Sequence, residues 1–407
     1  MAEIQPFAGI RYRRDDLARV LAPPYDVISD AYRDELCARD PHNVARVILT
    51  RTYDDAGYAE AGETYRRWLR EGVLQPDPEP SLYLLEQSFV AAGRALRRFG
   101  VLARFRAEDA ARGVILPHEH TRAAAKEDRW RVLAATKANF SPIFLMFPDP
   151  TAAFTALVLD VIGHPPAAQY ADDGGVGHRL WRVRDPGTVG RYQALLGSVP
   201  SYIADGHHRH ATALRHRDAV GPDGAWTLGY FTPLDAPGLV VLPYHRLLSE
   251  GPTPGEAEAR LGLRFRLTPV AGAADAAARV AASRAGYAFA LAWPGGRALV
   301  AEAGPEADGL LSPVAPGCLR VLETYFLHHA VLGPLLGVPE AAVSYVHSLG
   351  EAEEALATSS CGLAVLMRAT PVLQIVGVAD AGESMPAKST FFHPKLPSGL
   401  VIHPLVA

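Results

Sequence analysis

Residues 202–209 read Tyr-Ile-Ala-Asp-Gly-His-His-Arg, an apolar stretch that passes through Asp205 and Gly206 into a polar segment. This pattern predicts a short strand over 202–204, a break at Asp205-Gly206 and a helix over about 207–218. A glycine at such a junction lets the backbone approach a ligand closely. Because the first turn of a helix has free N–H groups, we expect a phosphate-binding junction here.

The side chains at this junction add to that expectation. His207, His208 and Arg209 supply donors at the same point, and Asp205 could hold a magnesium ion or orient a hydroxyl group. The structural alternative is that Asp205 caps the helix and the histidines lie on the surface. Three kinds of functional side chain around one glycine favour the functional interpretation.

A second segment, Pro117-His-Glu-His-Thr121, also carries chemistry. On an extended segment His118 and His120 share a face and Glu119 points away. The pattern H-E-x-x-H is absent, so a metal site would need a third ligand from elsewhere. Glu119 is a candidate general base if it faces the same cleft.

A helix is predicted from 121 to 138, with Thr121 as its N-cap. Arg122, Lys126 and Arg129 follow at spacings i, i+4 and i+7, which places three cations on one face. That face is either a solvated basic stripe or, beside a phosphate-binding loop, an anion-binding wall.

A third segment, Ala22-Pro-Pro-Tyr-Asp-Val-Ile-Ser29, begins with two prolines that rigidify a loop. The loop presents Tyr25 and Asp26 just before a helix for which Ser29 is the expected N-cap. An ordinary turn with a helix entry is the alternative.

The lysines point to a fourth segment. Lys and Arg together number 40, but we count only four lysines, which fall within 117–143 and 383–399: Lys126, Lys137, Lys388 and Lys395. A position that keeps lysine in so arginine-rich a chain indicates a need for a compact ammonium group, as in phosphate sites. We therefore expect the tail 385–399 to pack back onto the body and deliver Lys388, Ser389 and Lys395, with a simple C-terminal strap as the alternative.

The remaining sequence predicts an α+β (mixed α/β) fold, because strands, helices and hairpins alternate without a Rossmann or Walker A glycine motif. His328 and His329 are expected to be packing or surface residues.

We predict three regions: a core with the phosphate site over 1–250, an accessory α/β subdomain over 251–345, and a C-terminal α/β segment and tail over 346–407. Further predicted elements are a helix over 14–21, a strand over 44–49, a hairpin over 81–106, mainly helix over 252–285, a hairpin over 286–303 and a helix over 317–332.

Composition narrows the class of protein. The 407 residues carry a formal net charge of -4, which argues against a dedicated nucleic-acid-binding protein. Three scattered cysteines indicate no disulfide framework and fit a reducing, cytoplasmic location. The sequence contains no run of about 18 apolar residues, so we predict no membrane span. The N-terminus lacks the apolar region of a signal peptide.

Four segments together resemble a bacterial and archaeal family known as domain of unknown function 1015 (DUF1015), in order from Pro6 to Leu400: PFAGIRY…APPYDVIS, HEHT…KEDR…SPIF, YIADGHHR and AGESMPAKSTFFHPKLPSGL. The Asp205–Arg209 motif is, in addition, similar to one in free-serine kinases of the ParB/sulfiredoxin superfamily. That resemblance implies a ParB/sulfiredoxin-like nucleotide-binding core. It also implies phosphate transfer from ATP or ADP, with Mg²⁺, to the hydroxyl of free L-serine or a similar metabolite.

The kinase interpretation gives roles to the residues above. The expected partners are a small-molecule substrate and a nucleotide, without membrane or nucleic acid, and a homodimer is left open. Glu119 or Asp26 would accept the hydroxyl proton, and Lys126, Lys388 or Lys395 would clamp the phosphoryl group. The expected nucleotide contacts are Asp205, Gly206, His207, His208, Arg209, Ser389 and Lys395, with Asp205 on the metal. The expected substrate contacts are Tyr25, His118, Thr121 and Arg129.

Two other functions stay open at this point. One is a metal-dependent phosphohydrolase or nucleotide hydrolase, with ligands from His118, His120, His207 and His208. The other is a non-catalytic nucleotide-binding switch of the ParB type.

Overall fold

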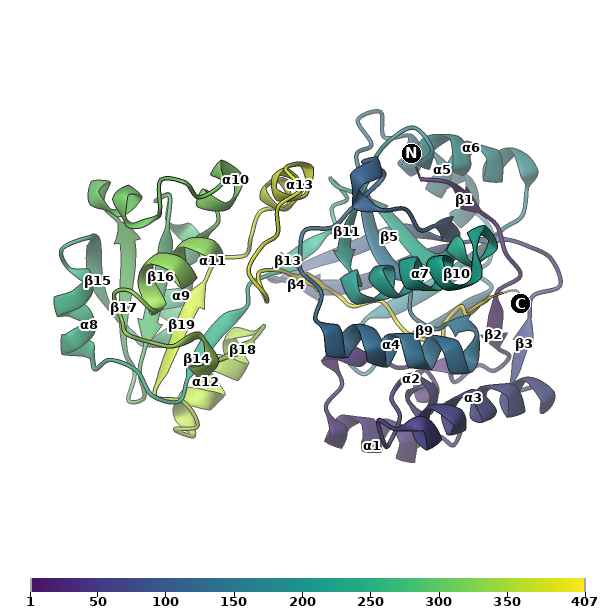
Figure 1. Cartoon of the computed structure of the whole chain (residues 1–407), viewed down its shortest axis with the longest axis horizontal. Coiled ribbons are helices and arrows are strands. Elements are labelled where there is room, and N and C mark those ends of the chain that lie inside the picture. The colour runs from purple at the N-terminus through teal and green to yellow at the C-terminus, as the bar shows by residue number, and fades with distance from the viewer. Residues whose placement is uncertain (1, 406–407) are drawn as a thin grey trace. The chain divides into compact units, whose positions relative to one another are not determined.

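The computed structural model describes residues 2–405, which form a mixed α/β chain with two compact units. The first unit contains the residues up to Pro117, Thr121–Val240 and the tail from Pro394 onward. The second unit contains His118–His120 and Val241–His393 (Figure 1). In the described part of the chain, no helix is both long and apolar enough to cross a membrane.

A mixed nine-stranded sheet forms the centre of the first unit. Its order is β6-β11-β8-β12-β5-β4-β10-β9, with β1 beside β5. The pairs β6–β11 and β8–β12 are parallel, and the others are antiparallel. The strands are β1 (Ile4–Gln5), β4 (Leu82–Ala91), β5 (Arg94–Arg106), β6 (Ile115–Leu116), β8 (Ile143–Phe147), β9 (Ala168–Ala171), β10 (Gly177–Val183), β11 (Ser201–Asp205) and β12 (Trp226–Pro233).

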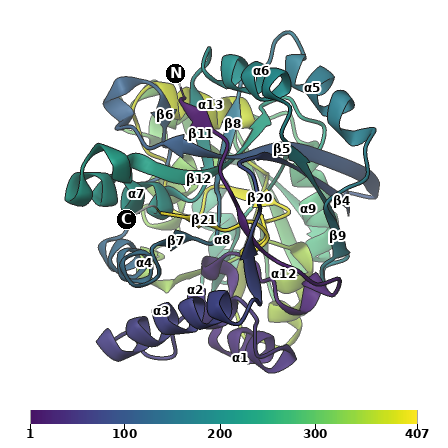
Figure 2. The same ribbon diagram turned by 90° about the vertical axis from the view of Figure 1, so that its right-hand side faces the viewer.

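Helices cover this sheet (Figures 1 and 2). On one face, α5 (Ala153–Ile162) and α6 (Pro186–Leu196) pack apolar side chains against alternate strand residues such as Leu82 and Leu84. Away from α5 and α6 lie α1 (Asp30–Arg39), α2 (Ala45–Ile48), α3 (Asp55–Arg70), α4 (Ala123–Thr136) and α7 (His207–Val220). Two short pairs complete the unit: β2 (Ile10–Tyr12) with β3 (Leu74–Pro76), and β7 (Ala138–Asn139) with β21 (His403–Pro404).

The second unit is an antiparallel six-stranded sheet with helices on both faces. Phe289 and Leu291 lie in one core and Ala290 and Ala292 in the other, because successive side chains of a strand point to opposite faces. The strands, in sheet order, are β15 (Phe265–Ala271), β17 (Arg297–Ala303), β16 (Ala288–Ala292), β19 (Leu363–Met367), β14 (His245–Leu248) and β18 (Val343–Val346). The other elements are α8 (Pro254–Leu261), α9 (Gly272–Ala282), α10 (Gly317–Arg320), α11 (Glu323–Phe326), a π-helix (Leu327–Leu332), α12 (Leu349–Ala357), α13 (Val372–Asp380), β13 (Val240–Leu242) and β20 (Phe391–His393).

Several predicted elements are confirmed. The strand and helix around Asp205-Gly206 form β11 and α7, and the hairpins predicted over 81–106 and 286–303 form β4–β5 and β16–β17. Ser29 caps α1 by accepting a hydrogen bond from the Tyr32 N–H at 3.2 Å. These elements share strong local signals at their turns and caps.

Other predictions are wrong. Residues 45–48 form helix α2 rather than a strand, because the Asn43 side chain accepts the Ala45 N–H and the turn buries Ala45, Val47 and Ile48. The stretch 252–285 is mainly helical as predicted, in α8 and α9, but the prediction missed the edge strand β15, where Pro269 is tolerated because the strand lies at the end of the sheet. The helix predicted over 317–332 is broken into α10, α11 and a π-helix, and the one predicted over 14–21 is a single 3-10 turn at Leu17–Arg19.

Gly100 tests the packing of the first unit. A Cβ atom at Gly100 would lie 2.1 Å from Cζ of the buried Tyr230 ring. We expect Gly100→Ala to lower the free energy of unfolding by about 1–3 kcal/mol, because a packed core cannot absorb the added methyl group. Urea unfolding followed by tryptophan fluorescence measures this, since four tryptophans lie in the first unit: Trp68, Trp130, Trp181 and Trp226.

Gly190→Ala is the matched control. Gly190 lies inside α6 and has nothing within 4 Å of an added Cβ, so this change should be neutral or stabilising by up to about 1 kcal/mol. Equal effects of the two substitutions would contradict the tight packing of Gly100 against Tyr230.

Candidate functional site

The strand-to-helix junction has the backbone that the sequence predicts. Strand β11 ends at Asp205, and Gly206 adopts φ +101° before α7 begins. A side chain at Gly206 would be strained by this φ and would also lie 3.0 Å from Cζ of Arg209. No side chain caps this end of α7, so the partial positive charge of the helix N-terminus is available to an anion.

Asp205 forms a buried ion cluster with two cations. Its Oδ1 accepts a hydrogen bond from Lys395 Nζ at 2.6 Å, and its Oδ2 accepts one from Arg209. The three side chains are between 12% and 15% exposed. Burial raises the pKa of Asp205, but the charges of Lys395 and Arg209 outweigh burial and hold the pKa well below its usual range. The cluster therefore combines one anion with two cations.

Arg209 connects the junction to a second strand. Its guanidinium also donates to the Pro142 carbonyl, one residue before β8. Its Nε–H is buried and has no hydrogen-bond partner within residues 2–405. Arg209 thus keeps one donor that the described part of the protein does not use.

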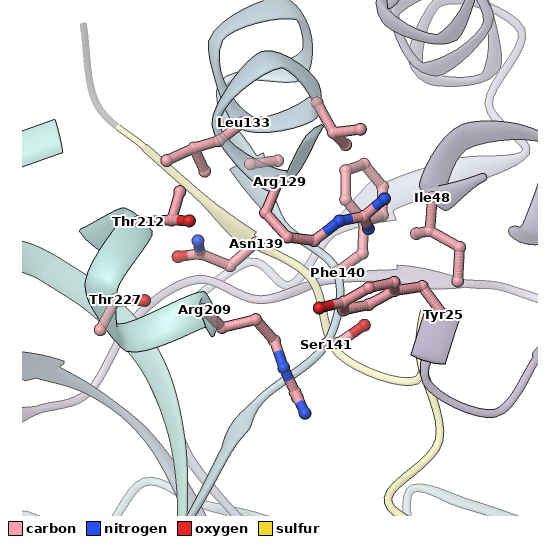
Figure 3. A pocket seen from close by; sticks show the side chains of 12 residues that line it. Tyr25, Ile48, Arg129, Leu133, Asn139, Phe140, Ser141, Arg209, Thr212 and Thr227 are labelled. Atoms are coloured by element: carbon pink, nitrogen blue, oxygen red, sulfur yellow. The ribbon is translucent and has the colours of Figure 1, made fainter. Parts of the chain in front are cut away.

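A small cavity of about 60 Å³ lies beside Arg209 (Figure 3). Its wall includes Tyr25, over whose ring the Arg129 guanidinium stacks at 3.8 Å from the centroid. Burial, followed by the nearby Asp26, raises the pKa of Tyr25 to about 12, so the phenol stays protonated and can donate at neutral pH. The cavity is smaller than sites that enclose a whole nucleotide.

His208 joins the starts of two helices. Its Nε2 accepts the backbone N–H of Arg122 at 3.0 Å. Burial, followed by the Arg122 charge, lowers the pKa of His208, which favours the neutral ring that this acceptor role requires. Thr121 is therefore not the N-cap of α4: the cap position is Arg122, without a side-chain bond.

Parts of all four predicted segments meet in the first unit. Lys395 reaches Asp205, and Arg129 reaches Tyr25. Ser398 Oγ donates to the Pro23 carbonyl at 3.2 Å and contacts Ser141 Oγ at 2.6 Å. Asp26 and Lys126 both influence the pKa of His208, so these two groups also lie near the junction.

The expected basic stripe on α4 is wrong in one respect. Arg129 is 8% exposed and forms an ion pair with Asp128, while Arg122 lies at the helix start. The i, i+4, i+7 spacing predicts a shared face but not what that face contacts. Arg129 is turned inward because Tyr25 offers it a ring.

His207, the first residue of α7, is buried in the first unit, and the remaining predicted residues belong to the second unit. His118 is buried, with Nε2 3.4 Å from Thr390 Oγ1, and its carbonyl accepts the Met385 N–H at 2.8 Å. The adjacent Glu119 forms an isolated parallel β-bridge with Met385. Lys388 Nζ lies 5.2 Å from the Tyr244 ring centroid, and Ser389 is buried. Their participation in the Asp205 site stays a prediction.

A magnesium ion at Asp205 would lie beside the charges of Lys395 and Arg209, which disfavour a further cation in this arrangement. Within either unit, the described residues include no group of three His, Cys, Asp or Glu side chains placed to hold a metal. The metal roles expected for Asp205 and for His118, His120, His207 and His208 stay predictions.

Sequence reasoning missed several polar residues of the cavity wall, namely Asn139, Ser141, Thr212 and Thr227. Thr212 lies one turn after His208 on α7, so helical spacing could have pointed to it. Thr227 comes from β12, and no local signal connects it to the site.

The fold and site define a mixed α/β protein with a cationic, glycine-containing strand-to-helix junction. The chain belongs to the family described as "Protein of unknown function (DUF1015)", whose model matches residues 4–322. No curated protein matches the chain.

Three of the similar solved structures are a free serine kinase variant in complex with ADP, a conserved hypothetical protein from Pyrococcus furiosus, and C-terminally truncated SbnI from Staphylococcus aureus. The first is 12% identical with a TM-score of 0.38, covering 72% of this chain and 88% of that chain. The second is 14% identical with a TM-score of 0.36, covering 72% and 94%. The third is 10% identical with a TM-score of 0.36, covering 72% and 84%.

The buried ion cluster leads to a stability prediction. We expect Asp205→Asn to lower the free energy of unfolding by about 3–5 kcal/mol at pH 7, because it leaves two buried cations without their anion. The effect should be constant above about pH 4 and should shrink as pH falls further, because Asp205 of the unfolded chain then binds a proton, whereas folded Asp205, with its lowered pKa, stays charged until the pH is lower still. Urea unfolding across a pH series measures both.

Asp109→Asn serves as the control. Asp109 pairs with Arg217 near the other end of α7 and is 56% exposed, so its loss should cost under about 1 kcal/mol. A cost for Asp205→Asn as small as that for Asp109→Asn would contradict a stabilising role of the buried cluster.

Proposed function

We propose that this protein is a nucleotide-dependent small-molecule kinase with a ParB/sulfiredoxin-like core. It would transfer the terminal phosphoryl group of ATP or ADP to the hydroxyl of free L-serine or a similar metabolite. The observation that supports this most is the uncapped start of α7 beside the Lys395–Asp205–Arg209 cluster. The likeness of the Asp205–Arg209 motif to that of free-serine kinases agrees with it.

The electrostatics of this junction suit a phosphate chain. Lys395 and Arg209 exceed Asp205 by one positive charge, and the α7 N-terminus adds a partial positive charge. Phosphoryl transfer depends mainly on positioning and charge stabilisation. The unused Nε–H of Arg209 would donate to a phosphate oxygen. Asp205 would hold both cations in place, since its two oxygens are already occupied.

The acceptor would approach from the Tyr25–Asp26 side. Its hydroxyl oxygen forms a bond to the terminal phosphorus while the bond to the leaving phosphate breaks, and ADP departs when ATP is the donor. The exposed Asp26 carboxylate would accept the hydroxyl proton. The protonated Tyr25 phenol would donate a hydrogen bond, and Lys126 would clamp the phosphoryl group. His207 and His208 would contribute to nucleotide binding.

The small cavity limits how the nucleotide binds. With about 60 Å³ beside Arg209, only a small polar group fits there. The nucleotide would therefore place its phosphates at the α7 N-terminus and its base outside this cavity. The proposal also keeps Glu119 as an alternative base, His118 as a substrate contact, and Lys388 and Ser389 as phosphate contacts.

A turnover assay tests this function. Purified full-length protein is incubated with Mg²⁺, ATP or ADP and a pool of amino acids and small alcohols, and products are identified by mass spectrometry. We expect a phosphorylated product such as O-phosphoserine. Arg209→Ala should reduce its formation by at least about 100-fold, because charge stabilisation of the transition state is lost. Arg209→Lys retains the charge but loses the planar guanidinium. Its rate of product formation should lie between those of the wild-type protein and Arg209→Ala.

Arg217→Ala is the matched control on the same helix. Arg217 lies at the other end of α7 and pairs with Asp109 and Asp218, so product formation should stay within about twofold. Consumption of the nucleotide without a phosphorylated acceptor would contradict the kinase function and favour a hydrolase. Nucleotide binding without turnover would replace it by a switch.

A further inference from the structure

The second unit contains a cavity of about 440 Å³. Its lining belongs entirely to this unit, and its polar members include His120, Tyr325, His328, His329 and Glu340. A volume of this size falls in the range of small-molecule sites. The exposed His120 reaches it because residues 118–120 pair with the chain near Met385.

The wall that carries His328 and His329 has an unusual backbone. Residues Leu327–Leu332 form a π-helix directly after α11. Wide π turns are rare and occur frequently at functional sites. Here the π-helix buries Leu327, Ala330 and neighbouring apolar residues in the core, while His328 and His329 line the cavity.

Behind this wall lies Arg246, a fully buried arginine on β14. Its guanidinium donates to the Tyr244 carbonyl at 2.5 Å, to the Lys388 carbonyl at 3.5 Å and to His328 Nε2 at 3.3 Å. Within residues 2–405 it has no carboxylate partner. Burial lowers the pKa of Arg246 only to about 10, so the group is charged at neutral pH. A buried charge without a counter-ion is costly, and an anion nearby would offset that cost.

Arg246 also fixes the proton of His328. Because Arg246 N–H groups donate to Nε2, that nitrogen must be unprotonated, and the ring proton is on Nδ1. Burial, followed by the Arg246 charge, lowers the pKa of His328 to about 4, so the ring is neutral at pH 7. No hydrogen bond in the described part of the chain uses Nδ1. The Nδ1–H is therefore available as a donor.

We propose that this cavity binds a small organic anion whose carboxylate or phosphate group accepts a hydrogen bond from His328 Nδ1–H. Arg246 supplies the compensating charge from behind the ring. Glu340, also in the lining, disfavours a ligand with a second anionic group at its side of the cavity. This site is independent of the Asp205 junction, and its proposal does not rest on the kinase function.

Histidine NMR of the full-length protein tests this site. The protein is labelled with ¹³C,¹⁵N-histidine, and His328 and His329 resonances are assigned with His328→Phe and His329→Phe. We expect His328 to show the Nδ1–H tautomer. Titration with acetate and, separately, inorganic phosphate, at ionic strength matched with chloride, should give saturable shifts of both residues for at least one probe. The effective probe identifies the ligand group as carboxylate or phosphate.

Variants separate this site from general salt effects. With His329 as reporter, His328→Phe should weaken the affinity at least about tenfold, because it removes a hydrogen bond to a charged group. Arg246→Met replaces the charged side chain by an uncharged one of similar length, so it leaves no unpaired charge in the core. This variant should also weaken the affinity for the probe. His164→Phe, at an exposed histidine of the first unit, should leave the affinity unchanged.

Three results would overturn the proposal. One is an Nε2–H tautomer at His328. Another is the absence of saturation with both probes, and the third is equal affinity in His328→Phe and His164→Phe. Loss of kinase activity would leave the proposal unaffected, because the histidine shifts report on the second unit alone.

Discussion

The ion cluster of Asp205, Lys395 and Arg209 is the contact on which the organisation of the first unit depends. It joins the end of β11, the first turn of α7 and a tail that follows the entire second unit in sequence. Burying the carboxylate without its two cations, or the cations without the carboxylate, would leave an uncompensated charge at this depth and would be costly. The cluster therefore both closes the unit and places positive charge at an uncapped helix start.

The tail from Pro394 onward reinforces this closure with backbone contacts. Pro394 offers its carbonyl to the buried Arg98, and the Lys395 carbonyl accepts from Gln87 at 3.0 Å. Further on, Ser398 pairs with Ala22 and holds the loop that carries Tyr25. A segment near residue 398 thus positions side chains that belong to the first thirty residues of the chain. The site is for this reason a property of the complete first unit rather than of one motif.

The sequence predicted those parts of the structure whose signals are local. The junction at Gly206 and the hairpins follow from turn residues and periodicity, whereas α2 could not be predicted because burial overrides the β preference of its valine and isoleucine. Scarcity of lysine singled out both Lys395 and Lys388. It indicated that an ammonium is needed, but not which partner it meets: Lys395 binds a carboxylate, while Lys388 lies over an aromatic ring. Such partners depend on tertiary contacts that no spacing encodes.

Arg209 and Arg246 show two solutions to the burial of an arginine. Arg209 has a carboxylate beside it and keeps one N–H donor unused, so it can bind a further anion without being left unpaired when that anion departs. Arg246 has carbonyls, a neutral imidazole and the Tyr345 ring around it, so its donors are satisfied but no anion balances its charge. Hydrogen bonding and charge compensation are separate requirements, and a buried guanidinium that meets only the first favours an anionic ligand nearby. This distinction explains why His328 and His329, which have no recognisable motif in the sequence, become candidates for binding once Arg246 is seen behind them.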